Sequence, residues 1–136
     1  MFEKILCVDD DTITLMLCKK VIERVAFAYE VLTAKNGEEA IIYFDELAQK
    51  QQNHTASYPK LTFLDLNMPV MNGWEFLDTY LKNGYCEIFP EAKFIVLSST
   101  IDPQDVEKTK GYPMVIDFLS KPITKEMLEE LKPRLL

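Results

Sequence analysis

The sequence has 136 residues, 48% of them hydrophobic and 11% aromatic, which indicates one globular domain with a single core and excludes a disordered chain. Its net charge of −7 argues against a nucleic-acid surface, which needs basic residues, but is compatible with a cation or a basic protein partner. No apolar stretch is long enough for a membrane span or a signal-peptide core, so we expect a cytoplasmic chain with no membrane partner.

Strands and helices are predicted to alternate along the chain. Short apolar runs bounded by turn residues predict five strands, at residues 4–8, 29–34, 60–64, 93–97 and 115–119. Each run is followed by a helical pattern, and the five predicted helices open near Thr12, Gly37, Gly73, Asp102 and Thr124. This alternation predicts an α/β fold in which a parallel sheet has helices on both faces.

Some details of the helices and loops also follow from the sequence. In the first helix, Ile13, Leu17 and Val21 recur at helical spacing, with Cys18, Ile22 and Val25 beside them. The polar segment 49–58 and the segment 83–91 are predicted to be loops. Pro133 is predicted to end the last helix early, because proline lacks a backbone N–H.

Polar residues stand where four of the predicted strands end. The residues that follow strands one, three, four and five are, in that order, Asp9 with Asp10, Asp65, Ser98 or Ser99, and Lys121. The carboxyl ends of parallel strands meet at one edge of the sheet, which is the edge where open α/β sheets bind ligands. We therefore expect these side chains to lie close together.

The residue types at this edge predict phosphoryl chemistry. Three neighbouring carboxylates raise one another's pKa unless a cation compensates, and oxygen ligands with room for water suit Mg²⁺. Mg²⁺ and the Lys121 ammonium would neutralise the charge of a phosphoryl group during its transfer. Asp65 would then be the nucleophile that forms an acyl phosphate.

Four segments at the predicted strand ends resemble the response-regulator receiver domain of two-component signalling: ILCVDDD, FLDLNMPVMNG, VLSS and FLSKP. The resemblance extends over essentially the whole chain. It implies the flavodoxin-like strand order 2-1-3-4-5 and a single receiver domain over residues 1–136 without an output domain, similar to chemotaxis regulators. It also implies a signalling module that assists its own phosphorylation and dephosphorylation, and not a conventional enzyme.

The resemblance further implies roles for individual residues. Asp65 matches the phosphoacceptor of the family. Asp10 matches the acidic residue that binds Mg²⁺ directly, and Asp9 matches the one that acts through water. Asn67 matches the position whose backbone carbonyl completes the shell of the metal.

Three further residues match the part of the family site that responds to the phosphoryl group. Ser98 matches the hydroxyl that hydrogen-bonds this group, and Lys121 matches the lysine that pairs with it. Phe118 matches the aromatic switch residue on the fifth strand. The spacing to the lysine fits Ser99, whereas strand register fits Ser98, which we prefer.

The implied partners are a sensor histidine kinase or a phosphotransfer protein, and a downstream protein whose binding changes on phosphorylation. Two other classes of protein compete with this interpretation. A phosphatase of the haloacid-dehalogenase type also uses a strand-end aspartate and Mg²⁺, but it needs a second acid where this chain has Asn67. A flavodoxin-like cofactor carrier needs a phosphate loop after the first strand, where the acidic residues 9–11 would repel phosphate.

Overall fold

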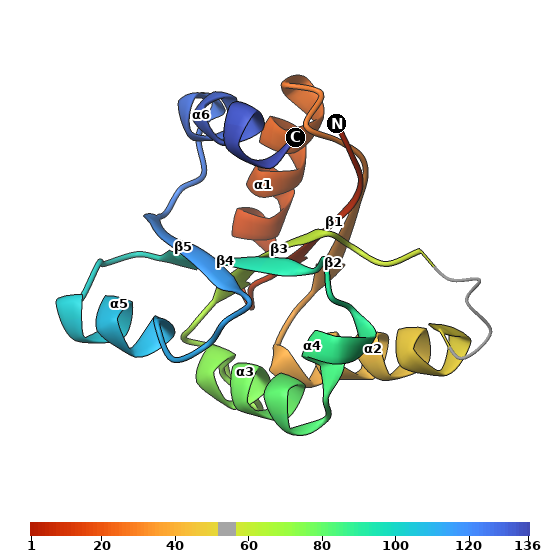
Figure 1. The fold of residues 1–136 in the computed structure, drawn as a ribbon. Coiled ribbons are helices and arrows are strands. Elements are labelled where there is room, and N and C mark those ends of the chain that lie inside the picture. Colours follow the sequence, from red (N-terminus) through yellow and green to blue (C-terminus); the bar gives the residue numbers. More distant parts are fainter. Residues whose placement is uncertain (52–56) are drawn as a thin grey trace.

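Five parallel strands form one sheet in the computed structural model, which describes residues 1–51 and 57–136. The strands are β1 (Phe2–Val8), β2 (Ala28–Ala34), β3 (Leu61–Asp65), β4 (Lys93–Ser98) and β5 (Val115–Ser120). Their order across the sheet is β2-β1-β3-β4-β5, so the predicted α/β class and strand order are confirmed (Figure 1). Each strand lies within two residues of its predicted bounds.

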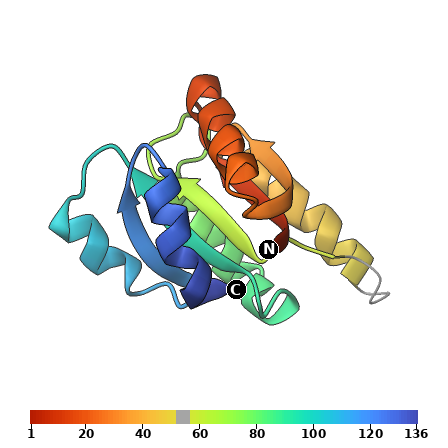
Figure 2. The same cartoon turned by 90° about the horizontal axis from the view of Figure 1, so that it is seen from above.

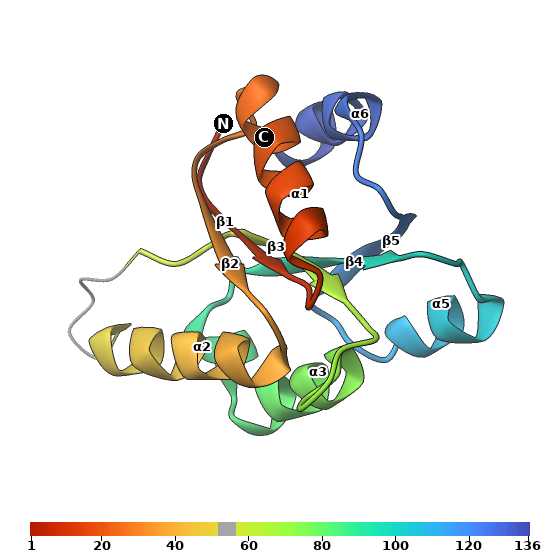
Figure 3. The same ribbon diagram turned by 180° about the vertical axis from the view of Figure 1, so that it is seen from behind.

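Helices cover both faces of this sheet. They are α1 (Thr12–Arg24), α2 (Gly37–Gln51), α3 (Gly73–Lys82), α4 (Tyr85–Ile88), α5 (Pro103–Thr109) and α6 (Lys125–Leu135). Helices α1 and α6 lie side by side on one face, and the other helices lie on the opposite side (Figures 1 and 2). Both termini lie next to each other, near the ends of α1 and α6 (Figures 1 and 3).

An aromatic cluster fills the core between the sheet and helices α2, α3 and α4. Phe44 of α2 is completely buried, and its ring centroid lies 5.3 Å from that of Tyr80 and 5.4 Å from that of Phe89. The ring of Tyr80 in turn lies 4.9 Å from that of Phe94 on β4. Edge-to-face and tilted aromatic pairs of this kind fix the helices on the sheet.

The second core lies under α1 and α6, and it buries only some of the apolar residues predicted for the first helix. Leu15, Cys18 and Ile22 are the buried residues of α1, whereas Ile13 is 63% exposed and Leu17 is 47% exposed. Two apolar stripes run along this helix at similar spacing, and only the docking angle on the sheet decides which stripe is buried.

Three local predictions were wrong. The predicted loop 83–91 contains the short helix α4, so residues 1–51 and 57–136 form six helices and not five. This helix forms because Tyr85 donates a hydrogen bond to Asp45 and packs into the aromatic cluster. Helix α2 continues to Gln51, and residues 52–56 of the predicted loop 49–58 lie outside the described part. Helix α6 continues past Pro133 to Leu135, because proline removes only its own N–H donor and the N–H of Leu136 still donates to the carbonyl of Lys132 over 2.9 Å.

None of the helices in the described ranges is long and apolar enough to cross a membrane. The carboxyl ends of the strands all face the same edge of the sheet, since every pair of neighbouring strands is parallel. This carboxyl edge contains the polar residues that the sequence analysis singled out.

Candidate functional site

Two buried aspartates lie next to each other at the carboxyl edge. Strand β3 is buried along its whole length and ends at Asp65, which is 5% exposed. Val8 of β1 pairs with Leu64 of β3, so Asp9, also 5% exposed, follows β1 directly beside Asp65. The parallel register therefore brings together two carboxylates that are far apart in the sequence.

A third acid completes the cluster. Asp9, Asp10 and Asp65 each offer a carboxylate oxygen, and these oxygens lie within 4.8 Å of one another. Burial is the main reason that the pKa of Asp65 is raised, the negative charge of Asp9 raises it further, and Lys121 partly opposes both. Negative charge concentrated in this way is a suitable site for a hard cation such as Mg²⁺.

Lys121 neutralises part of this charge from the end of β5. Its Nζ atom lies 2.6 Å from Oδ2 of Asp9 and 3.3 Å from Oδ1 of Asp65. Burial lowers the pKa of Lys121, but the two aspartates outweigh burial and hold it above the ordinary value. The backbone N–H of Lys121 donates to the carbonyl of Ser98 over 2.8 Å, which ties the ends of β4 and β5 together.

The run of three aspartates divides into two roles. Asp11 is the N-cap of α1, where its side chain accepts hydrogen bonds from the backbone N–H groups of Ile13 and Thr14. The backbone N–H of Asp11 donates to Oδ1 of Asp9 over 2.9 Å, which orients that carboxylate. Asp9 and Asp10 are therefore the members of the run that belong to the acidic cluster.

The structure distinguishes the two candidate serines by burial. Ser98 is the last residue of β4 and is 4% exposed, and its Oγ atom accepts a hydrogen bond from the backbone N–H of Thr100. Ser99 is exposed. This difference supports Ser98 as the hydroxyl of the site, although its contact with a phosphoryl group stays a prediction.

The loop after β3 returns close to the end of that strand. The backbone N–H of Asn67 donates to Oδ1 of Asp65 over 3.4 Å, and the metal-binding role of the Asn67 carbonyl stays a prediction. The backbone N–H of Gly73 donates to the carbonyl of Leu66 over 2.9 Å. A Cβ atom at Gly73 would lie 2.6 Å from the carbonyl oxygen of Asp65, so only glycine fits at this position.

Phe118 is half-buried on β5. It lines a cavity of about 250 Å³ together with Val106 and Thr109 of α5. Phe118 therefore borders open space between β5 and α5, and its role as a switch stays a prediction.

Val70 is a strained residue that sequence reasoning missed. It has a φ angle of 69° and is 72% exposed, although β-branched residues strongly disfavour this left-handed conformation. An asparagine or glycine at this position would have signalled a left-handed turn, but the chain has a valine there. The strain lies in the loop that follows Asp65, five residues along the chain.

We expect Val70→Asn to increase the free energy of unfolding by about 1 kcal/mol, because asparagine tolerates the left-handed region. Urea unfolding followed by circular dichroism measures this change. Ile101→Asn is the matched control, since Ile101 is 53% exposed and its φ angle is not positive. A loss of stability in Val70→Asn would show that the valine side chain makes a stabilising contact.

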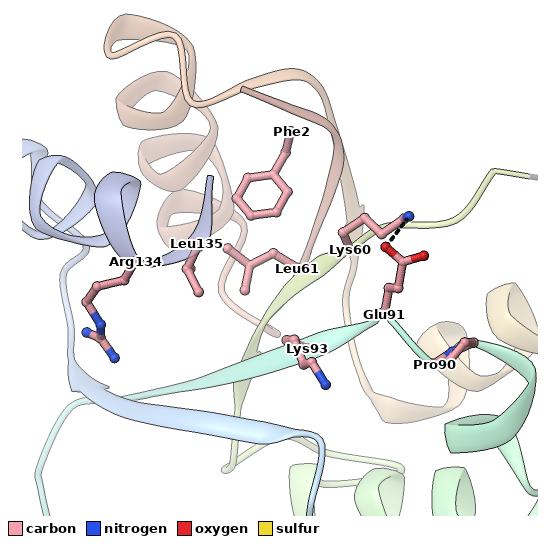
Figure 4. Close-up of a pocket in the computed structure, with 8 residues that line it drawn as sticks. All are labelled: Phe2, Lys60, Leu61, Pro90, Glu91, Lys93, Arg134 and Leu135. Atoms are coloured by element: carbon pink, nitrogen blue, oxygen red, sulfur yellow. Dashed lines mark hydrogen bonds and ion pairs between the residues drawn. The ribbon is translucent and has the colours of Figure 1, made fainter.

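The groove in Figure 4 lies at the other edge of the sheet and is not part of this site. It has a volume of about 530 Å³, and Phe2, Leu61 and Leu135 are among its lining residues. The ion pair Lys60–Glu91, with an N–O distance of 3.1 Å, lies on its rim (Figure 4). Within the described ranges, three acidic side chains come together only at the carboxyl edge, which therefore remains the candidate for phosphoryl chemistry.

The strand order and the site together define a flavodoxin-like α/β domain with two buried aspartates and a lysine at its carboxyl edge. Residues 5–132 match the response regulator receiver domain family. The chain belongs to this family, which functions in two-component signalling.

Several known proteins are similar to the chain. The probable transcriptional regulator ycf27 of Porphyra purpurea is 30% identical in an alignment of 131 positions that covers 93% of this chain and 44% of that protein. The hybrid signal transduction histidine kinase C of Dictyostelium discoideum is 28% identical in an alignment of 129 positions that covers 93% of this chain and 10% of that protein. The chain thus spans less than half the length of these relatives.

Solved structures agree with the fold. A two-component response regulator from Cytophaga hutchinsonii has a TM-score of 0.85 at 28% identity, with 98% of this chain and 96% of that chain covered. The chemotaxis protein CheY4 of Vibrio cholerae has a TM-score of 0.73 at 25% identity, with both chains covered completely.

Proposed function

We propose that the protein is a signalling switch in which Asp65 accepts a phosphoryl group from a sensor histidine kinase or a phosphotransfer protein. The observation that carries the proposal is the geometry of Lys121, whose Nζ atom lies 2.6 Å from Asp9 and 3.3 Å from Asp65. A lysine in this place pairs with the acceptor before transfer and can pair with phosphoryl oxygens after it.

The residues of the acidic cluster fit a divalent cation. Asp9, Asp10 and Asp65, with the backbone carbonyl of Asn67, are the groups that would hold Mg²⁺. Bound Mg²⁺ supplies neutralisation of the charge on the phosphoryl oxygens. The three carboxylates carry more negative charge than Lys121 alone can balance, which is why we include a metal.

The transfer step follows from the position of Asp65. One carboxylate oxygen attacks the phosphorus atom, a new O–P bond forms, and the bond from phosphorus to the donor nitrogen breaks. The electron pair of the broken bond leaves with the imidazole of the donor. Lys121 stabilises the negative charge on the phosphoryl oxygens, and Ser98 donates a hydrogen bond to one of them.

The response to phosphorylation involves the segment after β4. The Ser98 hydroxyl gains an acceptor when Asp65 is phosphorylated, and this draws the β4–α5 loop toward the site. Phe118 can enter the space that the loop leaves, next to the cavity that it already lines. A downstream protein would recognise the changed surface, since packed elements move between discrete arrangements.

Phosphorylation with a small donor tests the proposal. With Mg²⁺ and acetyl phosphate, we expect the intact mass of the protein to increase by one phosphoryl group that hydroxylamine removes. Asp65→Asn should abolish this adduct, whereas Asp105→Asn on α5 should retain it. An adduct that persists in Asp65→Asn, or that maps to Ser98, would contradict the assignment.

A further inference from the structure

Helix α5 has few contacts with the core. Thr109 is its one buried residue, and the side chains of Pro103, Gln104, Glu107 and Lys108 are exposed. The helix lies at the β5 end of the sheet, near α3 (Figures 1 and 3). An element with so little buried apolar surface has low local stability, so a small number of specific contacts decides its position.

Four side chains link this helix to α3. Nζ of Lys108 lies 4.2 Å from the ring centroid of Trp74, which is a cation–π contact. The hydroxyl of Tyr112, just after α5, donates a hydrogen bond of 2.6 Å to Oδ1 of Asp78 on α3. The rings of Trp74 and Tyr112 lie 5.9 Å apart. We call these four residues the α3–α5 latch.

The spacing of the latch residues produces two parallel contacts. Trp74 and Asp78 are four residues apart on α3, so their side chains lie on the same face of that helix. Lys108 and Tyr112 are also four residues apart. Lys108 contacts Trp74, and Tyr112 contacts Asp78. Burial and then the hydrogen bond to Asp78 raise the pKa of Tyr112 to about 12, so its hydroxyl stays a donor at neutral pH.

The α3 side of the latch is fixed to the acceptor strand. Gly73, which precedes Trp74, donates its N–H to Leu66 and lies against the backbone of Asp65. Asn72 and Glu75 form a capping box at the start of α3, which holds this turn rigid. Trp74 therefore keeps its place relative to Asp65.

The α5 side of the latch is connected to Ser98. The backbone N–H of Thr100 donates to Oγ of Ser98, and Asp102 caps α5 by accepting from the N–H of Gln104. A displacement of Ser98 and its loop toward Asp65 therefore shifts the start of α5. A shift of α5 against a fixed α3 changes the geometry of two contacts whose strength depends on distances of 4.2 and 2.6 Å.

We propose that the α3–α5 latch holds α5 in its resting position and thereby sets how readily phosphorylation of Asp65 switches the protein. This proposal rests on the proposed function. Because the latch stabilises only the resting arrangement, weakening it favours the switched arrangement by the same factor. An exposed cation–π contact corresponds to a factor of about 2 to 5 in an equilibrium constant.

The sequence contains one tryptophan, so the fluorescence of Trp74 reports directly on the latch. We would titrate the protein with beryllofluoride, a phosphoryl analogue, in the presence of Mg²⁺ and follow Trp74 emission. Lys108→Met removes the cation but keeps an apolar chain of similar length. We expect the half-saturating concentration of beryllofluoride to fall about twofold to fivefold in this variant.

Two further variants make the test specific. Tyr112→Phe keeps the ring and removes the hydrogen bond to Asp78. The half-saturating concentration of beryllofluoride should fall in this variant as well. Lys82→Met is the matched control, because Lys82 is exposed at the end of α3 and belongs to neither latch contact, and it should behave like the wild type. Unchanged or increased half-saturating concentrations in both Lys108→Met and Tyr112→Phe would overturn the latch.

Amide NMR separates failure of the latch from failure of the proposed function. If amides near Asp65 respond to beryllofluoride and the latch variants titrate like the wild type, the latch is wrong and the phosphoryl site stands. If no amide near Asp65 responds in the wild type, the proposed function is wrong, and the latch is overturned with it.

Discussion

We expect Lys121→Met to lower the free energy of unfolding of the magnesium-free protein by about 3 kcal/mol, because it leaves two buried carboxylates without a cation. The side chain of Lys121 is 18% exposed, and those of Asp9 and Asp65 are 7% and 6% exposed, so water screens this loss only weakly. Urea unfolding in the presence of a chelator measures the change.

Magnesium should reverse part of this loss. Lys121 and a divalent cation interact with the same carboxylates, so Lys121→Met should also bind Mg²⁺ more tightly than the wild type, as measured by calorimetric titration. Lys60→Met is the matched control, since Lys60 forms an exposed ion pair with Glu91. This substitution should lower the free energy of unfolding by less than about 1 kcal/mol. Equal stability of Lys121→Met and the wild type without magnesium would contradict the charge balance described for the site.

The second large effect is expected in the core. Phe44→Ala should lower the free energy of unfolding by about 4 kcal/mol, because it removes a completely buried ring from the centre of the aromatic cluster. The rings of Tyr80 and Phe89 are themselves buried against those of Phe94 and Tyr85, which limits how far they can fill the space. Chemical denaturation measures this change. The slope of the unfolding free energy against denaturant concentration should stay as in the wild type.

Ile42→Ala provides the comparison for this core variant. Ile42 lies two residues from Phe44 on the same helix and is 48% exposed, so its truncation should change stability by less than about 0.5 kcal/mol. A similar small effect for Phe44→Ala would mean that the cluster repacks around the missing ring.

The alternation of strands and helices was predictable because buried strands and amphipathic helices have different apolar periods. The site was predictable for a related reason. Parallel strands deliver their last residues to one edge, so Asp9, Asp65 and Lys121 were expected at the same edge, and the strand order then brings them into contact. The strand order came from the resemblance to the receiver family and not from the pattern of residues.

Other features depend on contacts between distant parts of the chain. Helix α4 forms because Tyr85 reaches Asp45, 40 residues away, and no local signal marks that contact. The buried stripe of α1 depends on how the helix docks, and the left-handed conformation of Val70 depends on the loop that encloses Asp65. Local propensity is overridden by tertiary structure at each of these places.

The neighbouring termini determine how this protein can be handled. Phe2 and Leu135 line the same groove at the amino edge of the sheet, whereas Asp65 lies at the carboxyl edge (Figure 4). A tag, a fluorophore or a sensor surface attached through either end therefore leaves the acidic cluster facing the solution. The latch is also left uncovered, so an immobilised sample can be exposed to Mg²⁺, phosphoryl donors and candidate partners in turn.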